Sequence, residues 1–311
     1  MYESFFELDR KPFALVPDPA FLYLGERHKT ALCLLEYAAA EGTSFAVLSG
    51  EIGTGKTTLL QCFLSHHGRS VRSGLIVHTH GAYTDLIRQI AEAFDLDASG
   101  ERETVHTRFR RFLAGLVRTG ERAVLVIDEA QNLSPETLEE LRLLSNLNPP
   151  GKQLVLQVLL AGQPQLRALL QRPELGQLVQ RISIDYHLTA LNLRDTIAYI
   201  RHRLTVSGGD PSLFDDLACA GIHVHTGGVP RLVNMLCDFA MVYSYAEGRR
   251  QIDFDVVQEV ADARRQGGLS GLIDLPANCD RSEVRARSLD ALAQLAGTES
   301  PETELLREDS A

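Results

Sequence analysis

Residues 50–57, with the sequence Gly-Glu-Ile-Gly-Thr-Gly-Lys-Thr, match the phosphate-cradling pattern G-x-x-x-x-G-K-[ST]. Glycines let backbone N–H groups turn toward phosphate oxygens without a Cβ clash. A helix that begins at Lys56 or Thr57 would point its positive end at the same charge. We expect Lys56 to contact the β- and γ-phosphates of ATP and the Thr57 hydroxyl to ligate Mg²⁺. The residues expected to bind the nucleotide are Gly50, Glu51, Ile52, Gly53, Thr54, Gly55, Lys56, Thr57 and Thr58.

Two acids, Asp128 and Glu129, directly follow the apolar run 123–127. A buried parallel strand places the residues after it at the carboxyl edge of the sheet, where ligands of such sheets bind. We expect Asp128 to hold Mg²⁺ through its water shell, because this ion keeps several waters. Glu129 is expected to polarise the attacking water during hydrolysis of ATP. The alternative for this pair of acids is a solvated loop.

Three further positions are expected to complete the site. Gln163 follows the apolar run 154–161 and is expected to sense the γ-phosphate or orient the water, unless it is only a turn residue. Arg181 precedes the last expected strand and is expected to reach the nucleotide of a neighbouring subunit, with Arg172 as its rival and a surface ion pair as the alternative. Arg231 opens a helix and is expected to meet the phosphates when the helical domain closes; otherwise it is an exposed arginine.

Apolar runs alternate with helical periodicity over residues 28–190. This alternation predicts an α/β fold with a mainly parallel sheet covered on both faces. The expected strands are 45–49, 75–79, 123–127, 154–161 and 182–188. The expected helices are 28–40, 57–66, 84–94, 103–118, 135–144, 165–170 and 174–180.

The rest of the chain has a different organisation. Residues 1–27 are rich in Phe and Pro, so we expect an extended segment strapped onto the domain that follows, since proline disfavours a long helix. An all-helical lid is expected over 191–265, with helices at 193–207, 211–220, 230–246 and 253–264 and with Asp253 as an N-cap. The polar, acidic residues 266–311 predict a partly disordered tail with one amphipathic helix at 281–295.

Composition excludes several classes of protein. The 311 residues are 44% hydrophobic and 23% charged, which argues against wholesale disorder. The net charge of −10 argues against a surface that coats nucleic acid. No apolar run reaches the ~20 residues that span a bilayer, and the N-terminus lacks a signal-peptide core. We therefore expect a cytoplasmic protein without direct membrane insertion.

The remaining polar patterns are expected to be structural. Five scattered cysteines show no ligand spacing, so we expect buried apolar residues in a reducing compartment rather than a zinc site or disulfides. The paired histidines, with no completing acid or cysteine, do not predict a metal site. A basic run is expected to form a solvated face, with DNA contact as the alternative. The paired histidines are His66, His67, His78, His80, His223 and His225, and the basic run consists of Arg102, Arg108, Arg110 and Arg111.

Several segments together resemble the ExeA, or general secretion pathway protein A, group of AAA+ ATPases over about residues 1–265. They are the opening 1–23, then 50–58, 127–131, 162–164, 199–204 and 227–231. The resemblance implies a P-loop NTPase (AAA+) fold with a five-stranded sheet and a helical lid, and a homo-oligomer with nucleotide between subunits. It makes Lys56 and Thr57 Walker A residues, Asp128 and Glu129 Walker B, Gln163 sensor 1, Arg181 the arginine finger and Arg231 sensor 2.

The resemblance also implies a process. We expect an ATP- and Mg²⁺-dependent motor or switch that assists assembly or regulation of an envelope secretion, pilus or exopolysaccharide export system. Full-length secretion members continue into a transmembrane helix and a peptidoglycan-binding domain, which we do not expect after Gln266. A role at the inner membrane is therefore expected through a protein partner. The alternative is a DNA-associated AAA+ helper of the transposition or replication-loader type, although the tail is too short and strand-poor for a winged-helix domain.

Overall fold

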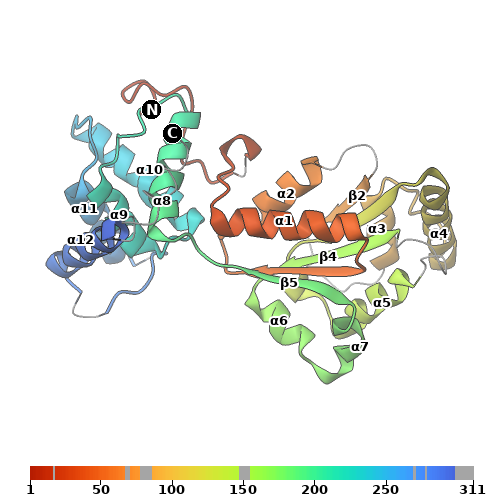
Figure 1. Cartoon of the computed structure of the whole chain (residues 1–311). Helices are drawn as coiled ribbons and strands as arrows, with labels where there is room; N and C mark the ends of the chain where they lie inside the picture. Colours follow the sequence, from red (N-terminus) through yellow and green to blue (C-terminus); the bar gives the residue numbers. More distant parts are fainter. Residues whose placement is uncertain are drawn as a thin grey trace, which may run out of the picture. The chain divides into compact units, whose positions relative to one another are not determined.

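The computed structural model describes residues 1–16, 18–66, 71–77, 86–146, 155–268, 271–276 and 279–297. The chain divides into two compact units. The sheet unit holds residues 27–52 and 56–189, and the helical unit holds residues 1–26, 53–55 and 190 onward. In Figure 1 the strands lie in the first unit among helices, and the second unit is built from helices.

The sheet unit contains five parallel strands in the order β2-β3-β4-β1-β5. They are β1 (Phe45–Gly50), β2 (Val71–Ile76), β3 (Arg122–Ile127), β4 (Leu156–Gly162) and β5 (Ile182–Leu188). The expected fold, a five-stranded parallel sheet in a P-loop protein, is confirmed. Because Ser49 of β1 pairs with Gly162 of β4 and Ile127 of β3 pairs with Leu160, the residues that follow these three strands meet at one edge.

Helices cover both faces of this sheet. Side chains alternate between the two faces of a strand. Phe45 and Val47 of β1 belong to one cluster with residues of α3 to α7, whereas Ala46 and Leu48 are buried outside that cluster. The second face of the sheet is covered by α1 and α2. Figure 1 shows α1 lying across the sheet. The helices are α1 (Glu26–Glu41), α2 (Lys56–His66), α3 (Leu86–Ala93), α4 (Arg102–Thr119), α5 (Pro135–Ser145), α6 (Pro164–Leu170) and α7 (Gly176–Val179).

β2 differs from the expected strand 75–79, of which residues 78 and 79 lie outside the described part of the chain. It begins earlier, at Val71, and forms the edge of the sheet beside β3. Arg72 and Ser73 are exposed there. A strand that is not buried on both faces carries polar residues. The apolar run in the sequence therefore covers only the second half of β2, and the prediction missed its first half.

The helical unit contains α8 (Leu193–Val206), α9 (Asp216–Thr226), α10 (Pro230–Ala246), α11 (Phe254–Gln266) and α12 (Arg281–Gly297). The expected helical region is confirmed, and Asp253 caps α11 by accepting the N–H of Val256 (3.1 Å). The expected helix 211–220 was wrong. Asp215 accepts the N–H of Ala218 (2.6 Å) and so caps α9, which begins at Asp216 and runs on to Thr226.

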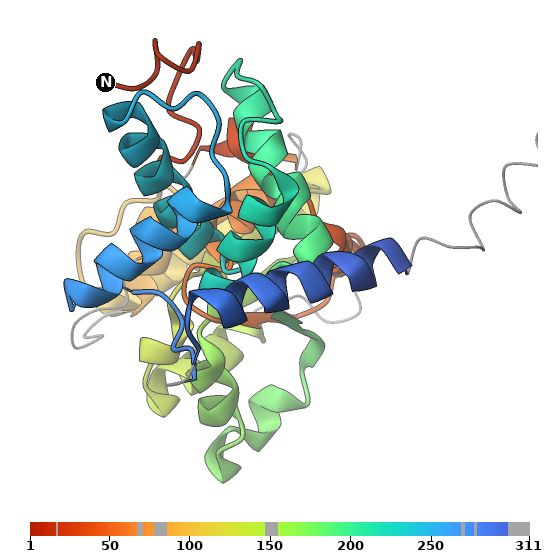
Figure 2. The same ribbon diagram turned by 90° about the vertical axis from the view of Figure 1, so that its left-hand side faces the viewer.

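The N-terminal segment lies in the helical unit, not on the domain that follows it in the sequence. Tyr2, Phe6, Leu8 and Phe13 share one apolar cluster with residues of α8 to α11. Figures 1 and 2 both show this segment beside the helical unit. The apolar side chains of α8 to α11 therefore supply the surface that the aromatic residues of the segment need.

The side chain of Arg203 in α8 binds the backbone of the N-terminal segment. This side chain is buried, and its guanidinium donates to the carbonyl oxygens of Pro12 and Ala14 and to the Tyr199 hydroxyl (2.8 Å). The same group lies 4.6 Å from the centre of the Phe21 ring. A buried cation is thus satisfied by carbonyl oxygens and an aromatic face.

Arg203→Met should therefore destabilise the helical unit. Its bonds to the N-terminal segment are charge-assisted, so we expect the free energy of unfolding in urea to fall by about 2–3 kcal/mol. Arg201→Met is the matched control on the same helix. Its ion pair with Asp216 is exposed, so the loss should stay within about 1 kcal/mol. Equal losses in the two variants would contradict this role for Arg203.

α12 extends the helical unit beyond the expected lid 191–265. It contacts α9 and α8, with Val284 and Ser288 buried, and Figure 2 shows it packed against the helical unit. The helix expected at 281–295 is thus confirmed. Within the described residues, no helix is both long and apolar enough to cross a membrane.

Candidate active site

The loop between β1 and α2 has the backbone that a phosphate cradle requires. Gly53 and Gly55 adopt left-handed conformations, with φ of 82° and 96°, which glycine reaches without steric cost. α2 begins at Lys56 and has no acidic residue in its first turn. The first N–H groups of a helix have no partner within the helix, and together with its positive end they can bind an anion.

Lys56 is buried, with 6% of its surface exposed. Its ammonium donates to the carbonyl oxygens of Gly50 (2.7 Å) and Glu51 (3.0 Å). Burial lowers the pKa of Lys56, and the charges of Glu129, Asp128 and Glu51 oppose that shift. The ammonium is thus folded back onto its own loop, where phosphate oxygens would take the place of the two carbonyls.

Thr57 and Asp128 come together from α2 and the end of β3. The Thr57 hydroxyl donates to the carboxylate of Asp128 (Oγ1 to Oδ2, 2.7 Å). Asp128 is buried, and its other oxygen accepts the N–H of Glu129 (2.9 Å). These hard oxygen donors fit Mg²⁺, which takes one or two protein ligands and keeps its remaining waters.

Glu129 turns the chain sharply after β3. Its φ of 55° and ψ of 35° are left-handed, a conformation that costs a non-glycine residue about 1–2 kcal/mol. Its carboxylate oxygen Oε2 accepts N–H bonds from the side chains of Gln131 (2.7 Å) and Gln163 (3.2 Å). The structure therefore brings Glu129 and Gln163 together.

Gln131 is a site residue that our sequence analysis did not single out. Its side-chain oxygen accepts the backbone N–H of Gln163 (2.9 Å) while its NH₂ group bonds to Glu129. The sequence shows only that one glutamine, Gln131, lies two residues after Glu129 and that another, Gln163, lies at the end of the neighbouring strand. Nothing in the sequence shows that the two amides bond to each other.

The outer residues of the loop differ in exposure. Glu51 and Ile52 are exposed, whereas Thr54 is buried and Thr58 is half-buried. Ile52, with 59% of its surface exposed, is a large apolar side chain next to the phosphate cradle.

Arg181 is held within its own chain. It donates to the carbonyl oxygen of Arg142 (3.2 Å) and to the Ser145 hydroxyl (2.8 Å), both in the last turn of α5. Arg172 is exposed and lies 4.0 Å from the carboxylate of Glu174. Arg231 is exposed at the second position of α10, in the helical unit.

Two of the paired histidines form internal hydrogen bonds. The Nδ1 atom of His223 lies 2.9 Å from the Thr196 hydroxyl, and the Nε2 atom of His225 lies 3.2 Å from the Gln258 side chain. Burial lowers the pKa of both rings, that of His225 to about 4. His67, His78 and His80, and the side chain of His66, lie outside the described residues.

The cysteines are free thiols, and they are less uniformly buried than expected. Cys33 is exposed and Cys279 is half-buried, so the expectation that all of them are buried was wrong. Among the described residues, no group of three or more His, Cys, Asp or Glu side chains is placed to hold a metal ion.

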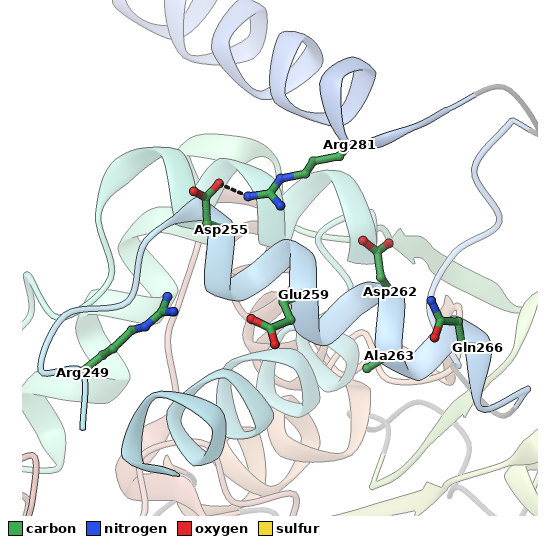
Figure 3. Close-up of a pocket in the computed structure, with 7 residues that line it drawn as sticks. All are labelled: Arg249, Asp255, Glu259, Asp262, Ala263, Gln266 and Arg281. Atoms are coloured by element: carbon green, nitrogen blue, oxygen red, sulfur yellow. Dashed lines mark ion pairs between the residues drawn. The ribbon is translucent and has the colours of Figure 1, made fainter. Parts of the chain in front are cut away.

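A polar pocket of 510 Å³ lies in the helical unit (Figure 3). Asp255, Glu259 and Asp262 line it along one face of α11, and Arg281 pairs with Asp255 (2.6 Å). A phosphate there would face three carboxylates, so this pocket is not the nucleotide site. The lining residues are Arg249, Asp255, Glu259, Asp262, Ala263, Gln266 and Arg281.

The chain is similar to known proteins over most of its length. The family described as AAA domain matches residues 39–170. General secretion pathway protein A of Aeromonas hydrophila is 40% identical over 254 residues, which are 81% of this chain and 46% of that protein. The chain thus spans about half the length of this relative.

Solved structures share the fold at low identity. The ORC2 protein of Aeropyrum pernix, in ADPNP–ADP complexes, matches with a TM-score of 0.62 and 15% identity, over 82% of this chain and 71% of that one. Cdc6p from Pyrobaculum aerophilum matches with a TM-score of 0.56 and 18% identity, over 80% of this chain and 71% of that one.

Proposed function

Because the chain is similar to general secretion pathway protein A over 81% of its length and matches the AAA domain family over residues 39–170, we propose that it binds ATP with Mg²⁺ and hydrolyses it to ADP and phosphate. The observation that carries this proposal is the cluster at one edge of the sheet. There the Lys56 ammonium, the Thr57 hydroxyl bonded to Asp128, and the Glu129 carboxylate follow β1 and β3. Each side chain has the chemistry that phosphoryl transfer to water needs.

The residues divide the chemical work. Lys56 exchanges its two carbonyl partners for phosphate oxygens and stabilises the charge that develops on them. Thr57 and Asp128 would hold Mg²⁺, which supplies further neutralisation of the phosphates when bound. Glu129 polarises the water that attacks the γ-phosphate in line. Gln163, bonded to the same carboxylate, is proposed to contact the γ-phosphate.

We further propose a homo-oligomer in which an arginine completes the site of a neighbour. Arg181 would first have to leave its bonds to Arg142 and Ser145, whereas the exposed Arg172 would have to leave a long ion pair with Glu174. Both therefore stay as candidates for the finger. Arg231 of the helical unit is proposed as the second sensor, as the resemblance of residues 227–231 to the ExeA group implies.

We propose that ATP turnover serves a protein component of an envelope secretion, pilus or exopolysaccharide export system. The support is the similarity to general secretion pathway protein A. A DNA-associated role is disfavoured because two cations of the basic run are paired, Arg102 with Glu140 and Arg108 with Asp97.

Hydrolysis measured with and without duplex DNA separates the two roles. If the protein serves export, we expect the rate of ATP hydrolysis to be unchanged by DNA. We also expect a Lys56→Ala substitution made in the host chromosome to reduce export of the envelope substrate. DNA-stimulated hydrolysis, with DNA binding that weakens steeply above about 50 mM salt, would overturn the export role.

A further inference from the structure

The side-chain amide of Gln131 uses both of its ends inside the site. Its nitrogen Nε2 donates to Oε2 of Glu129 (2.7 Å), and its oxygen Oε1 accepts the backbone N–H of Gln163 (2.9 Å). One side chain therefore connects the residue that follows β3 to the residue that follows β4.

Gly162, the last residue of β4, leaves the space that this amide occupies. A Cβ atom at position 162 would lie 2.5 Å from Oε1 of Gln131, closer than such atoms approach one another. A side chain at position 162 would therefore displace the amide of Gln131 from its present place. The absence of a side chain at the end of β4 lets η2 (Ala130–Asn132) approach that strand closely.

The two bonds fix which way the amide faces. A backbone N–H can only donate, so Gln163 must meet the oxygen of the amide, and the NH₂ group is left to point at Glu129. The bond to the carboxylate is charge-assisted and is shorter than the bond that Gln163 makes to the same oxygen. Gln131 is therefore the stronger of the two restraints on the Glu129 carboxylate.

We propose that Gln131 is a positioning residue for ATP hydrolysis. It holds the Glu129 carboxylate in the orientation that polarises water. Because its other end is bonded to the backbone of Gln163, a shift of Gln163 on contact with phosphate would also change the orientation of the Glu129 carboxylate. The proposal rests on the proposed role of Glu129 in hydrolysis.

The first test compares kcat with nucleotide affinity. For Gln131→Ala we expect kcat to fall about 10- to 100-fold, as is typical for the loss of a group that orients a reacting side chain. The affinity for ATP should change less than about 2-fold, because Gln131 is not part of the phosphate loop. The matched control is Gln177→Ala, at an exposed position of α7, which should have the wild-type kcat. A loss of affinity with unchanged kcat would overturn the proposal.

A second variant keeps the test valid if Gln131→Ala does not fold. Gln131→Met fills a similar volume without either hydrogen bond, and it should show the same fall in kcat. Gln131→Glu keeps an acceptor for the Gln163 N–H but loses the donor to Glu129, so it should be as slow as Gln131→Ala. A Gln131→Glu protein with wild-type kcat would overturn the proposal, since the donor would then be dispensable.

The decisive experiment uses the double variant that combines Gln131→Ala with Glu129→Gln. If Gln131 acts through the Glu129 carboxylate, the double variant should hydrolyse ATP no more slowly than Glu129→Gln alone. A further fall by the full factor of the single variant would overturn the proposal. Failure of the proposed function is distinct, because then Glu129→Gln itself would keep the wild-type rate.

Discussion

Lys56→Ala is expected to lower ATP hydrolysis by about 10²–10³-fold, the range seen when one preorganised donor to a developing charge is removed. Lys56 is the buried cation whose ammonium sits on the loop carbonyls of Gly50 and Glu51. Without it, the phosphates lose a charge-assisted partner. Nucleotide affinity should fall as well, and both are measured by phosphate release and equilibrium titration.

The matched control is Lys29→Ala, because Lys29 is exposed on α1. It should leave the rate and the affinity at wild-type values. Circular dichroism should show that the Lys56→Ala protein keeps its helix content. A Lys56→Ala protein that binds and hydrolyses ATP normally would mean that the phosphate loop is not the nucleotide site.

Glu129→Gln is expected to keep ATP binding but to lower kcat by at least ~10²-fold, as for the loss of a general base. The substitution retains an oxygen that can accept the N–H groups of Gln131 and Gln163, so the local hydrogen bonds survive. What it removes is the negative charge that polarises the water. The measurement is single-turnover hydrolysis beside the dissociation constant for ATP.

Glu92→Gln, at an exposed position of α3, makes the same chemical change away from the site and should have the wild-type kcat. Loss of ATP binding in Glu129→Gln would place Glu129 among the binding residues. Normal turnover would exclude it as the group that activates water.

The central part of the site could be predicted from the sequence because its residues are close in the chain or follow apolar runs. The loop pattern places Lys56 at the start of α2, and the run 123–127 places Asp128 at the end of β3. Parallel pairing then brings these ends together, as the Thr57–Asp128 bond shows. Local pattern and sheet topology were sufficient for this part.

The orientation of Glu129 could not be predicted in this way. It depends on a left-handed backbone that glutamate rarely adopts. It also depends on the amide of Gln131 and on the space beside Gly162. These are contacts between two strand ends, and a single sequence carries no periodic signal for them.

The position of residues 1–16 was equally beyond the sequence pattern. Their aromatic side chains show that the segment needs an apolar surface, but not which one. The helical unit supplies it, with the buried Arg203 bonded to the carbonyl oxygens of Pro12 and Ala14. Because the partners are far apart in the chain, proximity in sequence predicted the wrong surface.

The measurement that tests the central claim most directly is titration of the purified protein with a fluorescent ATP analogue, with and without Mg²⁺, followed by phosphate release. We expect saturable binding that ATP and ADP displace, with phosphate release that requires Mg²⁺. A protein that binds neither nucleotide when Mg²⁺ is present would contradict the assignment of this loop and these carboxylates as an ATP site.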